Sequence, residues 1–484
     1  MTYRLRAVRT LLACTILMTT WSARAADLEQ PLKRLDLGDG DQIVFLGDSI
    51  THQCLYTQYV EDYFYTRFPQ TRIKFHNAGV GGAKAWDALE RFDRDVAAYK
   101  PKYVTVLLGM NDGTYKPYSE EVFRTYRRDM TTLIGQIRDA GAVPILMTPT
   151  MYDARAARLG SRKRPPETNE LYNSVLAYFG TWLRDVAVES GYGFVDMHSL
   201  LNNVTLARRK NQPEFTMIPD AVHPGPAGQA VMAYALLSEL GTPRLVSRVQ
   251  ILRASSDAPD GRATGGSISA LKKTEDEIEF TWLAESLPWV LPEEAQEGAR
   301  LVKLGHRMSK ESFAVHGLRA GRYKLTIDGQ PVGTYGSAAL ARRIELQSNA
   351  ETPQYQQAAE VAELNQTRNS GPVRSLRGLW LGFQGYSRLR AQSEASPEDK
   401  ELAARVTAAN EKLEDMEDRI AEYEAAAREI EDQIFEINQP RPRKYVLTRI
   451  KRSEETARRR RGRKRINQRE KAAVGEAATS TEGG

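Results

Sequence analysis

Cysteine is scarce in this sequence. Only two cysteines, Cys14 and Cys54, occur among its 484 residues. Cys14 falls in an N-terminal segment that we expect to be removed, and the single thiol that remains cannot form an intramolecular disulfide. Stability must therefore come from packing rather than from disulfides. No Cys/His motif surrounds Cys54, so we expect it to be a small buried side chain and not a nucleophile.

Long apolar runs are also lacking. The chain is 41% hydrophobic and 27% charged, which is typical of soluble proteins. The apolar stretch 11–21 is shorter than the roughly 20 residues of a membrane-spanning helix. It follows an arginine-rich start and precedes Ala23-Arg24-Ala25. This pattern predicts a signal peptide over residues 1–25 and a secreted or periplasmic protein with no membrane span.

Histidine is rare as well. The chain has six histidines, and their spacing matches no known set of metal ligands. We therefore predict neither a metal site nor a cofactor, so any chemistry must come from the side chains and backbone alone.

The basic charge is concentrated at one end of the chain. The net charge is +6, but residues 451–484 alone hold eleven Lys and Arg against five Asp and Glu. The high pI therefore says little about what the folded part binds. We expect this tail to be disordered. Two interpretations stay open for it: attraction to anionic envelope polymers, and a solvated tail without specific function. Secretion argues against a specific nucleic-acid partner.

Strands and helices alternate over the first half of the mature chain. The apolar run 42–47 is typical of a buried parallel strand, and Gly47-Asp48-Ser49 leads from it into helical spacing. Further strands are expected at 72–77, 103–108, 142–147 and 193–197, with a last helix at 226–240. This alternation predicts an α/β fold with a parallel sheet covered by helices on both faces.

The pattern changes near residue 246. Short strand-like segments predict a small β-rich module over residues 246–350, followed by helices over 351–440. Apolar residues keep a heptad spacing over 402–437. Two interpretations stay open: a dimerising coiled coil, which would give a homo-oligomer, and a helical hairpin packed on the preceding helices, which the short connection favours. Residues 441–484 are expected to form the basic tail.

Polar residues cluster where the expected strands end. Ser49, Gly82 and Asn111 follow the first three strands, and Asp220 lies three residues before His223 at the start of the last helix. The post-strand loops of a parallel sheet meet at one edge, so these groups are expected to converge. A hydroxyl, an imidazole, a carboxylate and hydrogen-bond donors are what an ester hydrolase needs.

Four blocks resemble, in this order, those of the SGNH/GDSL hydrolase superfamily of lipases and esterases. They are Gly-Asp-Ser-Ile-Thr at 47–51, Asn-Ala-Gly-Val-Gly-Gly at 77–82, Gly-Met-Asn-Asp at 109–112 and Asp-Ala-Val-His at 220–223. The resemblance predicts an SGNH hydrolase domain over residues 26–245. It implies a three-layer α/β/α sandwich with a flavodoxin-like parallel five-stranded sheet. The GxSxG motif of α/β-hydrolases is absent.

By position, the resemblance implies Ser49 as nucleophile and His223 as general base, with Asp220 orienting the imidazole. It also implies an oxyanion hole made by the backbone N–H groups of Ser49 and Gly82 and by the side-chain amide of Asn111. Activity is then expected to fall on acidification, because the protonated imidazole no longer accepts the serine proton.

Two assignments keep alternatives. Gly79 or Gly81 is the other candidate for the donor assigned to Gly82. His52, one helical turn beyond Ser49, is a candidate for substrate contact, and its alternative is a packed or solvent-facing role.

These features predict a serine esterase that acts through an acyl-enzyme on a small or polymeric acyl ester. The expected envelope location and the β-rich module favour O-deacetylation of carbohydrate. A lipase or lysophospholipase is the alternative within the family. A non-catalytic surface interaction protein on a hydrolase scaffold is the alternative from another class, and the four intact blocks argue against it.

Overall fold

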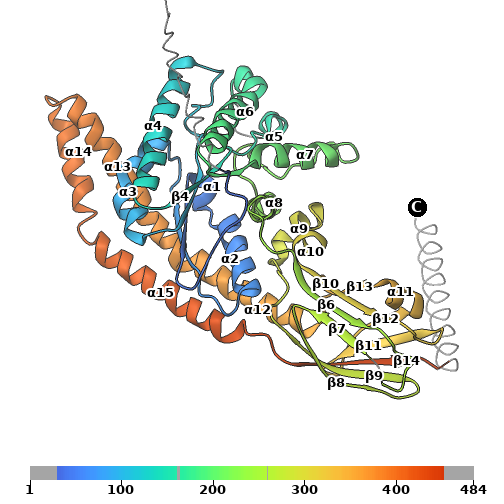
Figure 1. The fold of residues 1–484 in the computed structure, drawn as a ribbon. Coiled ribbons are helices and arrows are strands. Elements are labelled where there is room, and N and C mark those ends of the chain that lie inside the picture. The colour runs from blue at the N-terminus through green and yellow to red at the C-terminus, as the bar shows by residue number, and fades with distance from the viewer. Residues whose placement is uncertain (1–29, 161–163, 259, 452–484) are drawn as a thin grey trace, which may run out of the picture.

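The computed structural model describes residues 30–160, 164–258 and 260–451. The expected signal peptide and the Arg/Lys tail beyond residue 451 lie outside these residues. Within them, a parallel sheet of five strands forms the centre of the first domain (Figure 1). Its strands are β1 (Gln42–Gly47), β2 (Lys74–Gly79), β3 (Tyr103–Leu107), β4 (Val143–Met147) and β5 (Gly193–Val195). The strand order β2-β1-β3-β4-β5 confirms the flavodoxin-like topology.

Helices cover both faces of this sheet, as the alternating pattern predicts. On one face α2 packs against α8, and on the other α3, α4 and α6 lie side by side. The helices are α1 (Ser49–His52), α2 (Leu55–Arg67), α3 (Ala85–Asp95), α4 (Glu120–Asp139), α5 (Ala154–Leu159), α6 (Pro166–Glu189), α7 (Met197–Arg209) and α8 (Pro226–Glu239). The loop expected after β4 contains the short helix α5, which Asp153 caps by accepting from two backbone N–H groups. This confirms the three-layer sandwich.

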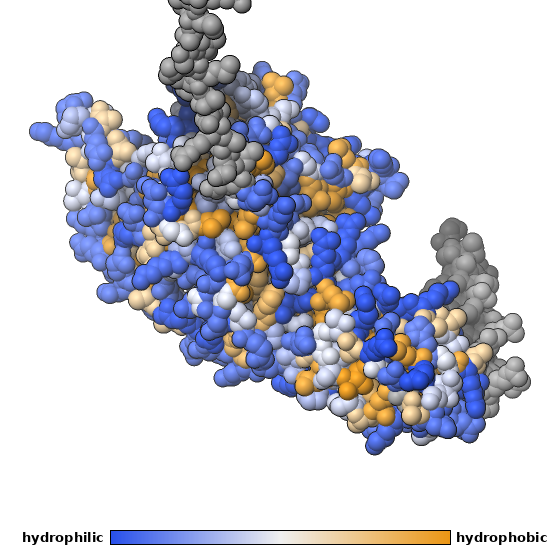
Figure 2. All heavy atoms as spheres, viewed as in Figure 1, coloured by the Kyte–Doolittle hydropathy of each residue, from blue (hydrophilic) through white to orange (hydrophobic). Residues whose placement is uncertain are grey.

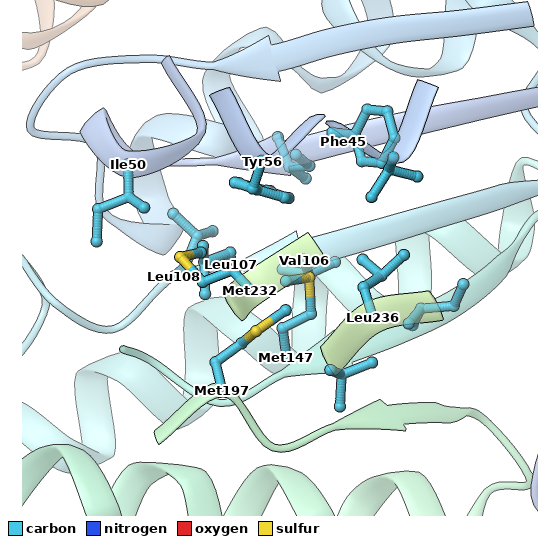
Figure 3. Packing of buried hydrophobic residues seen from close by; sticks show 14 of the residues in the cluster. Phe45, Ile50, Tyr56, Val106, Leu107, Leu108, Met147, Met197, Met232 and Leu236 are labelled. Atoms are coloured by element: carbon cyan, nitrogen blue, oxygen red, sulfur yellow. The ribbon is translucent and has the colours of Figure 1, made fainter. Parts of the chain in front are cut away.

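The core lies between the sheet and these helices. Side chains from the strands, such as Phe45, Val106 and Met147, meet Met232 and Leu236 of α8, and all five are almost fully buried (Figure 3). Continuous burial along β1 and β3 explains why these strands appear in the sequence as unbroken apolar runs. The rigid core fixes the carboxyl edge of the sheet, where the polar loops lie.

A second, β-rich unit follows the first domain and has its own apolar core. One sheet has the order β13-β10-β6-β7 and the other β12-β11-β14-β9-β8. The strands are β6 (Leu245–Ile251), β7 (Gly261–Thr264), β8 (Gly266–Lys273), β9 (Glu277–Ala284), β10 (Lys310–Val315), β11 (Arg322–Ile327), β12 (Gln330–Gly336), β13 (Ile344–Glu345) and β14 (Arg443–Arg449). Three short helices, α9 (Gln296–Leu301), α10 (Leu304–Met308) and α11 (Ser337–Arg342), connect them.

The position of β14 corrects the expected start of the tail at residue 441. Residues 443–449 pair with β9 on one side and β11 on the other, in the middle of the sheet. Only two residues of this strand, Tyr445 and Leu447, are buried, and lysine and arginine residues flank them in the sequence. Two apolar positions are too few to identify a strand, so its partners some 120 to 170 residues earlier decide its structure.

The C-terminal helices fold back on themselves. α12 (Pro353–Arg368), a π-helical turn (Asn369–Val373) and α13 (Arg374–Ala395) run in succession, and α14 (Lys400–Glu411) and α15 (Met416–Ile437) return along them. α14 packs on α13, and α15 passes from α13 across the π-helical turn to α12 (Figure 1). The heptad seam is therefore interrupted at residues 412–415, and its apolar residues pack within one chain.

Buried polar contacts bind the same helices to the first domain. Arg368 pairs with Glu61 of α2 at 3.0 Å, and Arg377 pairs with Asp95 of α3 at 2.9 Å. Asn365 also donates to Asp62 at 2.8 Å. The helical hairpin is thus a lateral layer of the first domain. None of the helices in the described part of the chain is long and apolar enough to span a bilayer.

Candidate active site

The turn after β1 places Ser49 at the first position of α1. Asp48 caps this helix, because its Oδ1 accepts from the Ile50 N–H at 2.9 Å. Only glycine fits at position 47, because a Cβ there would lie 2.1 Å from the Thr51 Oγ1 atom. The Ser49 side chain therefore stands at the carboxyl edge of the sheet, beside the backbone N–H groups of a helix N-terminus.

The loop before α8 brings His223 to Ser49 across 174 residues. The His223 Nε2 atom lies 2.8 Å from the Ser49 Oγ atom, and its Nδ1 atom lies 2.6 Å from Asp220 Oδ2. Asp220 also accepts from the backbone N–H groups of Val222 and His223. Nδ1 therefore carries the ring proton toward the carboxylate, and Nε2 is free to accept from the serine hydroxyl.

The electrostatics of Asp220 fit this arrangement. Partial burial by itself would raise the pKa of Asp220, but the hydrogen bonds from the His223 ring and from the two backbone N–H groups outweigh it and lower the pKa. The carboxyl group stays ionised and holds the imidazole in one tautomer.

The glycine loop after β2 has one backbone N–H group that is available at the cavity of Ser49. The Gly79 N–H donates to the Asn77 side chain at 2.9 Å, and the Gly81 N–H donates to His52 Nδ1 at 3.3 Å. Within the described residues no acceptor bonds the Gly82 N–H, and Gly82 lines the cavity that contains Ser49. Of the three glycines weighed from the sequence, Gly82 is thus the one whose N–H is available.

Asn111 reaches the site from the loop after β3. Its Nδ2 group donates to the Ala83 carbonyl at 3.0 Å and to Asp48 Oδ2 at 3.5 Å, and its Oδ1 atom accepts from the Tyr115 hydroxyl at 3.2 Å. These contacts fix the plane of the amide at the cavity wall, with one Nδ2 proton toward Ala83 and the other on the side of Asp48. Ser49, Gly82, Asn111, Asp220 and His223 all line one cavity of about 630 Å³.

His52 lies outside this cavity lining. Its ring is largely buried, and burial lowers its pKa to about 4, with the nearby guanidinium groups of Arg377, Arg374 and Arg91 adding to the effect. The neutral ring accepts the Gly81 N–H. The structure therefore places His52 behind the glycine loop, where it supports the backbone rather than facing the cavity.

Two buried carboxyl groups lie beneath the site. Burial raises the pKa of both Asp48 and Asp112 to about 7 against a smaller opposing effect of backbone hydrogen bonds, and the charge of Asp112 raises that of Asp48 further. Asp112 Oδ1 accepts from the Ala85 N–H at 2.9 Å, whereas its Oδ2 atom is buried and has no partner among the described residues. The sequence shows both residues next to the site but cannot show their burial.

Asp112→Asn is expected to flatten the pH dependence of stability. The folded pKa is raised, so between about pH 4 and 7 the native state holds a proton that the unfolded state has lost. Stability therefore decreases as pH rises through that window, and asparagine cannot ionise while its Oδ1 still accepts from Ala85. Melting temperatures at pH 5 and pH 8 should differ less in the variant than in the wild type, and an unchanged difference would contradict the assignment.

Several residues around the site have no motif that the sequence could reveal. Tyr115 and Arg164 line the cavity, with the Arg164 guanidinium 4.2 Å above the Tyr115 ring. Gln384 and Arg388 of α13 contact the glycine loop from about 300 residues away. Only Tyr115, four residues after Asn111, has a local signal that could have indicated it. Among the described residues, no group of three or more His, Cys, Asp or Glu could hold a metal ion.

The fold and the site together define a class: an α/β/α sandwich with a serine, a histidine and an aspartate in one hydrogen-bonded chain at the sheet edge, as in ester hydrolases. Residues 45–231 match the family model described as GDSL-like Lipase/Acylhydrolase family. This stretch is therefore a GDSL-like lipase/acylhydrolase domain, and the chain is an SGNH-type hydrolase of ester bonds.

Comparisons with known proteins agree with this assignment. An acetylxylan esterase from Geobacillus stearothermophilus is 26% identical over 229 residues, which are 43% of this chain and 97% of the relative. The uncharacterized lipoprotein YqeF of Bacillus subtilis is 38% identical over 76 residues, which are 15% of this chain and 30% of that protein.

A solved structure extends the likeness beyond the hydrolase domain. The structure called BT4096, a gut microbial diltiazem-metabolizing enzyme, is 26% identical, with a TM-score of 0.71 over 86% of this chain and 99% of its own. A match of this length includes most of the β-rich unit and the C-terminal helices. The three parts therefore occur together in another protein.

Proposed function

We propose that the chain is a serine esterase that removes O-acetyl groups from a carbohydrate through an acyl-enzyme. The observation that carries the proposal is the series of hydrogen bonds from Asp220 through His223 to Ser49. Ser49 lies in the cavity that Gly82 and Asn111 also line. A nucleophile, a base held in one tautomer and hydrogen-bond donors then surround one point.

The reaction would run in two steps. The Ser49 oxygen attacks the ester carbonyl while His223 Nε2 takes the serine proton, and the oxyanion is held by the N–H groups of Ser49 and Gly82 and by the Asn111 amide. His223 then gives the proton to the departing alcohol oxygen, which leaves an acetyl-Ser49 ester. A water molecule, deprotonated by the same imidazole, releases acetate and regenerates Ser49. Each donor is worth about 3 kcal/mol of transition-state stabilisation.

The residues that line the cavity around Ser49 favour a carbohydrate substrate over a lipid. A second groove of about 450 Å³ shares Gly82, Asn111 and Tyr115 with the catalytic cavity and adds Trp86 and Lys84. An indole beside cationic and hydroxyl side chains is suited to stack on a sugar ring while its polar edges meet the hydroxyls. The view in Figure 2 is mostly hydrophilic, with apolar residues in separate patches. The similarity to an acetylxylan esterase adds to this support.

The test is hydrolysis of p-nitrophenyl esters of increasing acyl length beside acetylated xylo-oligosaccharides, with Ser49→Ala as the blank. We expect kcat/KM to be highest for acetate and to fall by about tenfold or more at butanoate and longer chains, and we expect acetate release from the oligosaccharide. A preference for long acyl chains would indicate a lipase or lysophospholipase. No turnover on any ester would indicate a non-catalytic surface interaction protein on a hydrolase scaffold.

A matched variant of the same experiment separates the acyl side from the sugar side. Trp86→Ala is expected to raise KM for acetylated xylo-oligosaccharides by about 5- to 20-fold, because about 1–2 kcal/mol of stacking is lost. The kinetics on p-nitrophenyl acetate should change by less than about twofold, since that substrate has no sugar ring to stack on the indole. An equal effect on both substrates would contradict the assignment of the groove to the sugar.

We also propose that the protein works outside the cytoplasm. The N-terminal pattern over residues 1–25 predicts a signal peptide, and one of the relatives is a lipoprotein. An extracellular or envelope location agrees with a polymeric acetylated substrate. Cell fractionation with an antibody to the mature chain would test it, and retention of the intact precursor in the cytoplasm would contradict it.

A further inference from the structure

The glycine loop after β2 forms a turn whose central peptide matters for the proposed reaction. The Ala83 N–H donates to the Val80 carbonyl at 3.1 Å, and Gly82 has φ +69° whereas Gly81 has no positive φ. These features define a type II turn with Gly81 and Gly82 at its centre. One peptide unit carries both the Gly81 carbonyl and the Gly82 N–H, which point in opposite directions.

This peptide has a second orientation available. Type I and type II turns differ mainly by a half-rotation of the central peptide, and glycine at both central positions removes the steric preference between them. The rotation would exchange the directions of the Gly81 carbonyl and the Gly82 N–H. The donor proposed for the oxyanion would then be lost, so another group must select the orientation.

The C-terminal helix α13 supplies the groups that face this turn. Gln384 Nε2 donates to the Gly81 carbonyl at 2.9 Å, and Arg388 Nη2 donates to the Gly82 carbonyl at 2.8 Å. Gln384 is only 3% exposed. From the other side, His52 accepts the Gly81 N–H. Every backbone polar group of the two glycines except the Gly82 N–H is therefore engaged within the described structure.

Arg388 is itself held in place. Its Nε and Nη2 groups donate to the two carboxylate oxygens of Asp87 at 2.7 and 2.8 Å. Asp87 in turn accepts the Lys84 N–H at 2.8 Å at the start of α3. A bidentate pair of this kind fixes the guanidinium plane. The loop is thus bound at both ends to a rigid frame made of α3 and α13.

We propose that Gln384 and Arg388 are positioning residues of the oxyanion hole. They hold the central peptide of the 80–83 turn so that the Gly82 N–H faces the cavity. Donation to the Gly81 carbonyl also polarises the same amide and strengthens its N–H as a donor. The C-terminal hairpin is then part of the catalytic apparatus of the hydrolase domain. This inference rests on the proposed function, because the oxyanion arises only in that reaction.

Gln384→Met is the variant that tests the proposal. It keeps the length of the side chain, removes the donor and also removes a buried oxygen, Oε1, that has no partner among the described residues, so the fold should tolerate it. Loss of one oxyanion donor costs about 10²- to 10³-fold in rate. Because the peptide would still spend part of its time in the productive orientation, we expect kcat on p-nitrophenyl acetate to fall about 10- to 100-fold with KM within about twofold.

A thionoester separates positioning from a general structural effect. Sulfur accepts hydrogen bonds weakly, so hydrolysis of p-nitrophenyl thionoacetate draws less on the Gly82 N–H. The ratio of the ester rate to the thionoester rate should therefore fall about tenfold in Gln384→Met. Arg388→Met should lower the ratio in the same direction, and Arg388→Lys, which keeps a cationic donor, should restore part of it.

The control is Arg390→Gln, which removes a partly exposed ion pair between α13 and Glu90 of α3 away from the glycine loop, and it should leave kcat and the ratio unchanged. An unchanged kcat in Gln384→Met, or equal losses on ester and thionoester, would overturn the proposal. If Ser49→Ala hydrolysed p-nitrophenyl acetate like the wild type, the proposed function itself would fail. An inactive Ser49→Ala beside a fully active Gln384→Met would remove only the positioning role.

Discussion

Ser49→Ala and His223→Ala are each expected to lower kcat on p-nitrophenyl acetate by about 10⁴- to 10⁶-fold, and the double variant is expected to be no slower than either single one. In the proposed mechanism the two side chains act as one unit, with the 2.8 Å contact from Ser49 Oγ to His223 Nε2 as the route of the transferred proton. Once either is gone, the other has nothing to act on. Residual activity of about 10³-fold over water should remain from the oxyanion donors.

His198 provides the matched control for this prediction. It lies on α7, and its ring Nε2 is 3.1 Å from the backbone carbonyl of Asn173, with no contact to Ser49. His198→Gln should leave kcat unchanged within about twofold. Circular dichroism and thermal melting should show that all variants are folded. Additive losses in the double variant, or more than a tenth of the activity left in His223→Ala, would contradict the assignment of the base.

Arg377→Met is expected to lower the free energy of unfolding by about 3 kcal/mol or more. Arg377 is fully buried and donates with both terminal nitrogens to Asp95, at 2.9 and 3.0 Å. Burial by itself would raise the pKa of Asp95, yet Arg377, His76 and Arg91 together lower it to about 2. Without Arg377, a buried carboxylate loses its strongest partner. Denaturant unfolding of the purified chain measures the loss.

The network around Asp95 lies next to the candidate site, so we expect its loss to disturb the strand ends that carry the site loops. Arg91 donates to Asp95 and also to the Ala78 and Gly47 carbonyls, at the ends of β2 and β1. Arg390→Gln again serves as the control, because its pair with Glu90 is partly exposed to solvent, and we expect it to contribute much less than the buried pair, about 1 kcal/mol. If Arg377→Met were as stable as the wild type, α13 would be an appendage and not a layer of the hydrolase domain.

The contacts of the hairpin with the hydrolase domain are of two kinds. The pairs Arg377–Asp95 and Arg368–Glu61 fix the helices on the domain, whereas Gln384 and Arg388 reach the glycine loop directly. The structure of the diltiazem-metabolizing enzyme matches 86% of this chain. The same contacts can therefore be sought in that structure.

Much of the fold could be predicted from local patterns. The buried run 42–47 and the strands near 103–108 and 142–147 appear as unbroken apolar segments because both faces of a parallel sheet are covered. The heptad over 402–437 predicts helices, but its interruption at 412–415 follows from packing along α13, the π-helical turn and α12. β14 escaped prediction because its pairing partners, not its own residues, make it a strand.

The sequence by itself determined which residues form the candidate site. Ser49, Gly82, Asn111 and Asp220-x-x-His223 each follow or precede an element whose pattern is local, and a parallel sheet necessarily brings such loops to one edge. Only the tertiary structure decided which glycine N–H is available and what holds it. That choice depends on His52, Gln384 and Arg388 contacting the loop from elsewhere in the chain. Hydrogen bonds between residues 300 positions apart leave no periodic trace in a sequence, because they depend on how complete layers pack.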